Sequence, residues 1–290
     1  MPTRSPVCRA AGLAALVLTL TGCSAPESPT DSGAGNDVSA TALPSEHVHA
    51  VGVDPGDESI LLATHEGLFR RSGSGYERVG PVIDLMGFTV AGPGHYYASG
   101  HPGQGSELPE PVGLIESQDA GQTWQSLSRA GQSDFHTLTT SRAQITGYDG
   151  VLRTTSDGTT WSDRKGPDDV FDVAASPDGA VLLATTPTGP WRSSDVGATW
   201  LPIEGAPLLM FVEWRDASTA FGITPRGVVL YSEDAGMTWQ PAGVLDDTPQ
   251  AMGVHPSSTS DEVRVLVVGT DRLWESRDGG QSFAPFTDDP

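Results

Sequence analysis

One octapeptide, S-x-D-x-G-x-T-W, recurs along this chain and constrains its fold more than any other feature. Three complete copies end at Trp124, Trp200 and Trp239, a fourth ends at Phe283, and a shortened fifth ends at Trp161. Successive aspartates of these copies are 38, 38, 39 and 44 residues apart, and they are Asp119, Asp157, Asp195, Asp234 and Asp278. Short strands that repeat about every 40 residues are typical of a β-propeller with one four-stranded blade per repeat.

Each copy of the octapeptide predicts a tight hairpin turn. The aspartate can accept backbone N–H bonds across the turn, the glycine supplies a positive φ, and the aromatic residue packs between sheets. The octapeptide resembles the Asp box, also called the BNR repeat. That resemblance implies a structural role for the five aspartates and gives no information about a reaction.

From His47 onward the chain divides into six units, each of which begins with an apolar strand. These first strands start near Val48, Asp84, Phe135, Phe171, Leu209 and Ala251. The 290 residues include 35 Gly and 23 Pro, which favours one all-β domain over residues 47–290. We therefore predict a six-bladed propeller whose ring closes by contact between complete blades, and a seventh blade stays open as an alternative.

The N-terminus predicts export and lipid anchoring. Arg4 and Arg9 flank a short n-region, an apolar run over residues 10–20 comes next, and it ends in Leu-Thr-Gly-Cys at positions 20–23. The run is too short to span a membrane, so residues 1–22 are interpreted as a lipoprotein signal peptide. Cys23 then becomes the lipidated N-terminus, which places the protein on the extracytoplasmic side of the cell membrane. Residues 23–46, rich in Ser, Pro and Gly, form a flexible tether.

The net charge and the cysteine content limit which binding partners and which disulfides the mature chain can have. The leader contains two arginines and no acid, so its removal changes the net charge from −21 to −23. Such an acidic chain is not expected to bind nucleic acid or to be attracted to anionic lipid head groups. Because Cys8 leaves with the leader and Cys23 carries lipid, the mature chain has no disulfide. We expect a monomer that meets the membrane through its lipid and binds a small molecule, a glycan or a protein.

Histidines concentrate where a propeller places its ligand. Starts of innermost strands and turns between second and third strands share one rim, and the octapeptide hairpins share the other. This mapping places five of the seven histidines and two aspartates near the first rim: His47, His49, His65, His101, His136, Asp84 and Asp134. His95 and His255 map to the opposite rim. Imidazoles with nearby carboxylates suit a transition metal such as zinc or copper. Hydrogen-bonded packing and general acid–base catalysis stay open as alternatives.

The same residues also resemble a group of bacterial exported proteins described as glycosyl hydrolase-like or sialidase-like. The shared segments are H-V-H at 47–49, H-E-G-L at 65–68, M-G-F at 86–88, S-G-H-P at 99–102 and D-F-H at 134–136. The resemblance implies a propeller fold and a glycoside hydrolase-like alternative for the function. It leaves open whether the protein is an enzyme.

An ordinary sialidase is not expected. Sialidases hold the substrate carboxylate with three arginines, whereas the mapping places only Arg226 and Arg272 near the ligand rim, and no F-R-I-P-like segment is present. A glycosidase that uses two carboxylates, Glu66 with Asp84 or Asp134, stays open. Other Asp-box propellers are assembly factors or receptor ectodomains, so a protein-binding role is a third alternative.

The Leu-Thr-Gly-Cys segment at positions 20–23, a lipobox, leads to a direct prediction about anchoring. Replacement of the lipidated residue in a Cys23→Ser variant should release the protein from the membrane fraction, because a single non-lipidated chain keeps no anchor. Fractionation followed by immunoblotting measures the distribution. Recovery of the variant in the membrane pellet at the wild-type level would contradict lipid anchoring.

Overall fold

The strand Ile60–Thr64 (β2) shows why this sequence forms sheets that need a neighbour on both faces. All five of its side chains are buried. Leu61 and Ala63 pack against the second unit of the chain, whereas Ile60 and Leu62 pack against the last unit. Side chains of a strand alternate between its two faces, so a strand that is apolar at every position requires cover on both sides. A ring of sheets meets this requirement.

The structure is a computed structural model that describes residues 42–73, 75–142, 144–256 and 263–287. The predicted signal peptide, Cys23 and most of the predicted tether lie outside these described residues. Within the described ranges the regular secondary structure consists of strands. The same ranges contain no helix that is long and apolar enough to cross a membrane.

Four consecutive strands build each blade. Blade 1 contains β1 (Val48–Val53), β2 (Ile60–Thr64), β3 (Gly67–Ser72) and β4 (Gly75–Val79). Blade 2 contains β5 (Ile83–Gly92), β6 (His95–Pro102), β7 (Leu114–Ser117) and β8 (Gln125–Ser128). Blade 3 contains β9 (Thr137–Thr140), β10 (Ile145–Tyr148), β11 (Leu152–Thr155) and β12 (Ser162–Arg164). Blade 4 contains β13 (Asp172–Ala175), β14 (Leu182–Thr185), β15 (Trp191–Ser193) and β16 (Leu201–Pro202). Blade 5 contains β17 (Phe211–Trp214), β18 (Ala220–Ile223), β19 (Val228–Ser232) and β20 (Gln240–Val244). Blade 6 contains β21 (Ala251–Pro256), β22 (Val263–Val268), β23 (Leu273–Ser276) and β24 (Ala284–Pro285).

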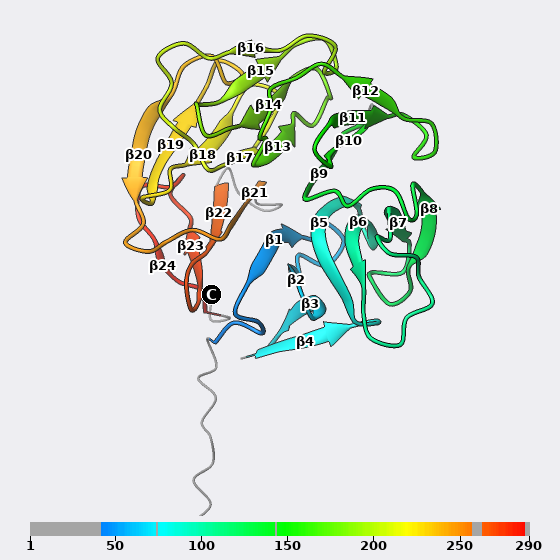
Figure 1. Cartoon of the computed structure of the whole chain (residues 1–290). Coiled ribbons are helices and arrows are strands. Elements are labelled where there is room, and N and C mark those ends of the chain that lie inside the picture. Colours follow the sequence, from blue (N-terminus) through cyan, green and yellow to red (C-terminus); the bar gives the residue numbers. More distant parts are fainter. Residues whose placement is uncertain (1–41, 74, 143, 257–262, 288–290) are drawn as a thin grey trace, which may run out of the picture. The chain divides into compact units, whose positions relative to one another are not determined.

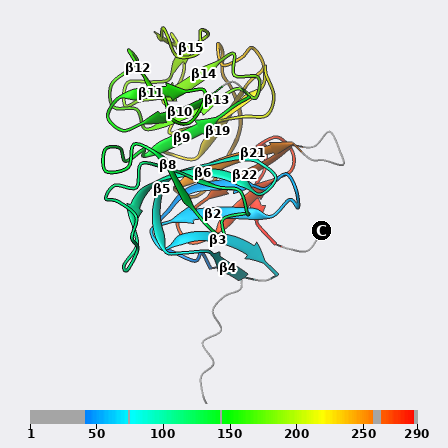
Figure 2. The ribbon, with the colours of Figure 1, turned by 90° about the vertical axis from the view of Figure 1, so that its right-hand side faces the viewer.

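The six sheets form a ring in which the first strand of each blade lies nearest the centre (Figure 1). Within every sheet the strands follow chain order and pair antiparallel. Seen from the side, blade 2 lies between blade 1 and blade 3 (Figure 2). The prediction of an all-β, six-bladed propeller is confirmed. Because blades 1 and 6 are each complete and pack through a shared apolar cluster, the ring closes without exchange of a strand.

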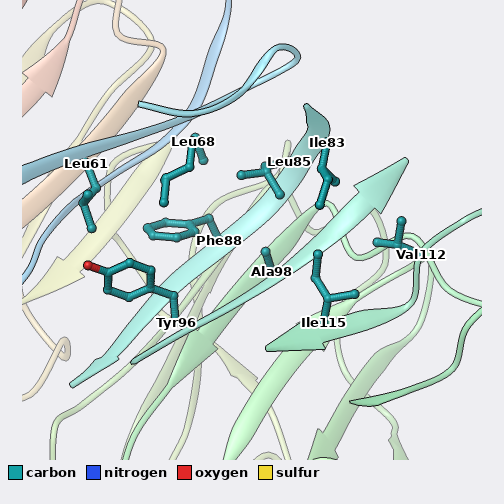
Figure 3. Close-up of a cluster of buried hydrophobic side chains, with 10 residues drawn as sticks. Leu61, Leu68, Ile83, Leu85, Phe88, Tyr96, Ala98, Val112 and Ile115 are labelled. Carbon is teal, nitrogen blue, oxygen red and sulfur yellow. The ribbon is translucent and has the colours of Figure 1, made fainter. Parts of the chain in front are cut away.

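The interface between blades 1 and 2 shows how neighbouring blades are joined (Figure 3). Phe88 and Tyr96 meet edge to face, with ring centroids 5.6 Å apart. The Tyr96 hydroxyl donates a hydrogen bond to the carboxylate of Asp54 on blade 1. Asp54 also accepts the backbone N–H of Gly94 at 2.9 Å. Burial, followed by the contact with Asp54, raises the pKa of Tyr96, so this interface combines apolar packing with a buried hydrogen-bond network.

The repeated octapeptides form the turns between the third and fourth strands of blades 2 to 6. In blade 4, one oxygen of Asp195 accepts the backbone N–H of Thr199 at 2.8 Å, and the other accepts its hydroxyl at 2.7 Å. The Ser193 hydroxyl accepts the N–H of Gly197 at 2.9 Å and donates to Asp195 at 2.9 Å. The aspartate side chain therefore accepts hydrogen bonds from the N–H and hydroxyl groups of its own turn.

The complete turns contain a second residue with positive φ that the sequence did not predict. Ala120, Val196 and Ala235, each directly before the glycine, adopt φ values of 60°, 61° and 58°. A β-branched residue such as Val196 is rarely found in this region of backbone space. The aspartate and serine hydrogen bonds therefore hold a locally unfavourable backbone in place.

Loss of one such aspartate should destabilise the protein. In Asp195→Ala the N–H and hydroxyl of Thr199 lose their acceptor, so the melting temperature should fall by a few degrees. Differential scanning calorimetry measures the shift. Glu204→Ala, which removes an exposed carboxylate in the same blade, serves as the control and should melt like wild type. Equal melting temperatures for both variants would argue against the turn's contribution.

Candidate metal centre

The innermost strands all begin at one rim of the ring, here called the top rim, and a cavity of about 510 Å³ lies there. We call it the upper cavity. His47, His49 and His136 line it from blades 1 and 3, and Phe171 and Phe211 line it from blades 4 and 5. Small-molecule pockets commonly have volumes of about 300–1,000 Å³. The upper cavity thus has the size of a ligand pocket, with histidines in one part of its wall and aromatic rings in another.

A β-bulge brings the first three histidines together. The pairing of β1 with β2 shifts register between Val48 and Ala50, which leaves His49 on a bulge. Bulges re-aim side chains and are common beside functional sites. His65, in the turn between β2 and β3, has its ring centroid 4.4 Å from that of His49. The ring of His47, just before β1, lies 4.6 Å from His49 and 5.6 Å from His65.

Three donor atoms of this group converge. His49 Nε2 and His65 Nδ1 are 3.3 Å apart, and His65 Nδ1 lies 2.9 Å from Asp84 Oδ1 on β5. The separation of His49 Nε2 and Asp84 Oδ1 is 3.9 Å. Tetrahedral zinc with bonds of about 2.0–2.2 Å holds its ligand atoms about 3.3–3.6 Å apart. These three residues could therefore hold a metal ion after only small adjustments.

The three atoms also have too few protons to satisfy one another. If the single Nδ1 proton of a neutral His65 points to Asp84, it must be shared with the lone pair of His49. If His65 instead accepts a proton from His49, its own lone pair faces the Asp84 carboxylate at 2.9 Å. A cation placed between the atoms would satisfy all three at once.

The charge state of His49 suits a metal ligand. Burial, followed by the charges of His47, His65 and His136, lowers the pKa of His49 to about 3. The imidazole is therefore neutral at physiological pH and carries the free lone pair that metal binding requires.

A second group lies beside the first and contains His101, Asp134 and His136. His136 Nε2 and His101 Nε2 both approach Asp134 Oδ2, at 2.7 Å and 3.2 Å. Hydrogen bonding to Glu110 raises the pKa of His101, and hydrogen bonding to Asp134 raises the pKa of His136. Burial acts to raise the pKa of Asp134, but the hydrogen bonds and charges of His136 and His101 lower it below its usual range. Glu110 was not identified from the sequence, because it belongs to the loop between β6 and β7 and no strand pattern places it.

All seven residues singled out as metal or ligand candidates thus lie at the top rim, in two adjoining groups. The catalytic candidate Glu66 is exposed in the same turn as His65. The carboxylates of Asp84 and Asp134 are in hydrogen-bond contact with His65 and His136. A glycosidase acid needs a raised pKa, so the lowered pKa of Asp134 makes it a poor general acid.

The carboxyl groups with raised pKa values are two residues that the sequence analysis missed, Asp172 on β13 and Glu213 on β17. Both line the upper cavity, and Glu213 also lines a second, lower cavity of about 400 Å³. Burial raises the pKa of Asp172 to about 6, and burial followed by the charge of Asp172 raises that of Glu213 to about 8. Asp172 accepts hydrogen bonds from the hydroxyl of Thr137 at 3.1 Å and the backbone of Val212 at 2.9 Å. An acid within an apolar innermost strand was the available sequence signal.

The arginines at the top rim require a correction. Besides Arg226 and Arg272, Arg129 lies there, in the loop between β8 and β9. Its guanidinium is 3.7 Å from the carboxylate of Asp149. The sequence mapping placed Arg226 and Arg272 at this rim but did not place Arg129. Among the described residues that line the upper cavity, none is an arginine, so a substrate-binding arginine triad is not formed there.

The two remaining histidines lie at the opposite rim. His95, at the start of β6, contacts Glu116 with 2.7 Å between His95 Nε2 and the carboxylate. His255, near the end of β21, lines the lower cavity. Both therefore offer matched controls for the top-rim histidines.

The fold and this cluster define the class: a six-bladed β-propeller whose top rim carries residues that could hold a metal ion. No protein-family model matches the sequence, and no curated protein sequence matches it. Similarity is found among solved structures. A GH74 xyloglucanase from Xanthomonas campestris matches with a TM-score of 0.61 and 18% identity, over 84% of this chain and 38% of that one. The chain therefore spans about two fifths of the xyloglucanase.

Two further solved structures match with somewhat lower scores. YCF48 bound to a D1 peptide matches with a TM-score of 0.53 and 14% identity, over 80% of this chain and 94% of that one. A chain of a nidogen–laminin complex matches with a TM-score of 0.54 and 12% identity, over 74% and 95%. At such identities the similarity shows only that the chain has a propeller fold. Its function has to be inferred from the residues at the top rim.

The raised pKa of Glu213, which lines both cavities, predicts that stability depends on pH. Its raised pKa means that the folded protein holds a proton that the unfolded chain releases between about pH 4.5 and pH 8. The free energy of unfolding therefore contains a contribution that falls as pH rises through this window. Glu213→Gln should remove it, so the variant should melt a few degrees above wild type near pH 8.5 and close to wild type near pH 5.5. Calorimetry at both pH values checks this, and an equal difference at the two pH values would contradict it.

Proposed function

We propose that this protein is a lipid-anchored, extracytoplasmic propeller that binds a transition-metal ion, zinc or copper, at the upper cavity. The observation that carries the proposal is the convergence of His49 Nε2, His65 Nδ1 and Asp84 Oδ1, with separations of 2.9–3.9 Å. Imidazole nitrogen and carboxylate oxygen are ordinary zinc ligands. The shortage of protons among the three atoms supports a cation in their midst.

Three protein ligands leave one tetrahedral position of the ion open. His49 lines the upper cavity, so an ion that it binds adjoins a space of ligand size. His47 is close enough to contribute, with its ring centroid 4.6 Å from that of His49. Zinc sites with three protein ligands and an open position are typical of metal centres that bind or activate a further molecule.

The lipobox at residues 20–23 supports the anchoring part of the proposal, and the octapeptide hydrogen bonds support its assignment as an Asp-box propeller. A net charge of −23 after loss of the leader attracts cations to the surface. We propose a monomer, because the ring is closed by its own first and last blades.

A glycoside hydrolase-like activity is the second candidate. The observation that favours it is Glu213, whose pKa of about 8 keeps the carboxyl group protonated at neutral pH beside the upper cavity. A protonated carboxylic acid of this kind can serve as the general acid of a glycosidase. The xyloglucanase similarity agrees with this candidate at the level of the fold.

A protein-binding role is the third candidate. Phe171 and Leu208 are 51% and 44% exposed near the start of the innermost strands of blades 4 and 5. The ring of Phe171 also contacts that of Phe211 on blade 5, with centroids 5.4 Å apart, and contiguous exposed apolar surface commonly marks contact sites. The similarity to YCF48 with a bound peptide agrees with this candidate at the level of the fold.

Metal binding predicts a rise in stability that replacement of one ligand should remove. Zinc at about 100 times its dissociation constant stabilises a folded protein by about 2.7 kcal/mol, so the melting temperature of untagged protein should rise by several degrees. His65→Ala should abolish most of this rise, because it removes a donor atom. The exposed side chain of His65 makes this replacement compatible with folding.

His255→Ala at the opposite rim is the matched control and should keep the full response to zinc. Isothermal titration calorimetry supplies the affinity directly. The absence of any response of the wild-type protein to zinc, copper or nickel would contradict the metal proposal. Hydrolysis of an aryl glycoside that resists chelators and is lost in Glu213→Gln would favour the second candidate instead.

A further inference from the structure

In the second group at the top rim, which contains His101, Asp134 and His136, a neutral His101 has too few protons to donate to both carboxylates that it faces. His101 Nδ1 lies 2.5 Å from Glu110 Oε1, and His101 Nε2 lies 3.2 Å from Asp134 Oδ2. A neutral imidazole has a proton on one nitrogen only. If that proton is donated to Glu110, the lone pair of Nε2 faces a carboxylate oxygen. Either a second proton on His101 or a cation between Nε2 and Asp134 is needed to satisfy this contact.

Asp134 supplies an independent sign that a partner belongs here. Its Oδ1 atom is buried and has no hydrogen-bond partner among the described residues. Its other oxygen, Oδ2, is approached by both His101 and His136. Buried carboxylate oxygens are normally paired or bound to a metal. Protonation of the histidines would satisfy Oδ2 but would leave Oδ1 unsatisfied, whereas a bound cation can take both carboxylate oxygens.

The arrangement of His101 also matches that of a metal ligand with an outer carboxylate. Metal-ligating histidines usually donate the N–H of the second ring nitrogen to a carboxylate, carbonyl or water, which fixes the ring and increases its basicity. Glu110 occupies this position on Nδ1, and Nε2 points toward Asp134.

We propose that His101, Asp134 and His136 form a second binding site for a divalent transition-metal ion, with Glu110 orienting His101 and the exposed His136 ring turning toward the ion as it binds. The site uses none of the ligands of the first site. It can therefore bind an ion whether or not the first proposal holds.

The two sites adjoin. Asp84 of the first group and His101 of the second are directly opposite each other on the paired strands β5 and β6. Side chains of such cross-strand pairs have Cβ atoms about 4.5–5.5 Å apart. His49 and His136, one from each group, both line the upper cavity. Two ions would thus face the same space, and their mutual repulsion should make the second ion bind more weakly than the first.

Metal stoichiometry tests this proposal. Untagged full-length protein is titrated with zinc by calorimetry, and the bound metal is counted by elemental analysis after dialysis. Wild type should bind two equivalents with separate affinities. His136→Ala should bind one, and so should His65→Ala, because each removes a ligand of one site. His95→Ala at the opposite rim should still bind two equivalents.

A milder variant keeps the test independent of folding. Glu110 is 61% exposed, so Glu110→Gln should fold normally. It should weaken the second zinc equivalent about 10–100-fold and leave the first unchanged, because it alters only the outer partner of His101. Circular dichroism and melting curves without metal verify that every variant is folded.

The remaining outcomes separate the two proposals. A single equivalent that is lost in His65→Ala and kept in His136→Ala would overturn the second site while the first stands. A single equivalent with the reverse behaviour would overturn the first site while the second stands. Two equivalents that persist in His136→Ala would also contradict the second site.

Discussion

Burial of strands on both faces is the constraint on which the rest of this structure depends. In β2 every side chain is buried, with alternate residues facing blade 2 and blade 6. A blade of this kind exposes a large apolar surface if either neighbour is missing, so closure of the ring is a condition for stability rather than a consequence of it. Because every blade has four antiparallel strands in chain order, all innermost strands begin at the same rim. The histidines and aspartates of blades 1 to 3 are neighbours for that reason.

Within this frame, small irregularities of the strands decide the chemistry. The bulge at His49 departs from regular pairing at the point where the strand reaches the upper cavity, and a second register shift occurs on β5 between Leu85 and Gly87. A regular ladder would alternate side chains strictly between the two faces of the sheet. Bulges relax that alternation, and here they coincide with donor atoms that come within 4 Å of one another. The top rim therefore combines a rigid scaffold with locally adjusted ligand positions.

The structural comparisons fit a fold that serves many activities. A GH74 xyloglucanase and YCF48 bound to a D1 peptide both share the propeller fold with this chain, at identities of 18% and 14%. A propeller fixes where loops converge and leaves the converging side chains free to vary. In this chain the converging side chains are imidazoles and carboxylates that share too few protons. That property belongs to the site and cannot be read from the fold.

The sequence by itself predicted six blades and left a seventh open, because five units carry an octapeptide that encodes its own turn through contacts within eight residues, such as those of Asp195 with Thr199. Once the blades are counted, their periodicity also places His49, His65 and His136 at one rim. Tertiary structure alone decided what these residues face. Glu110 and Arg129 lie in loops without periodicity, the pKa of Glu213 depends on burial by other blades, and the unpaired oxygen of Asp134 depends on packing across strands. Hydrogen bonds within a turn join residues that are close in sequence, so the sequence predicts them. The burial of a side chain and the distances between ligand atoms depend on segments that meet only in the folded structure.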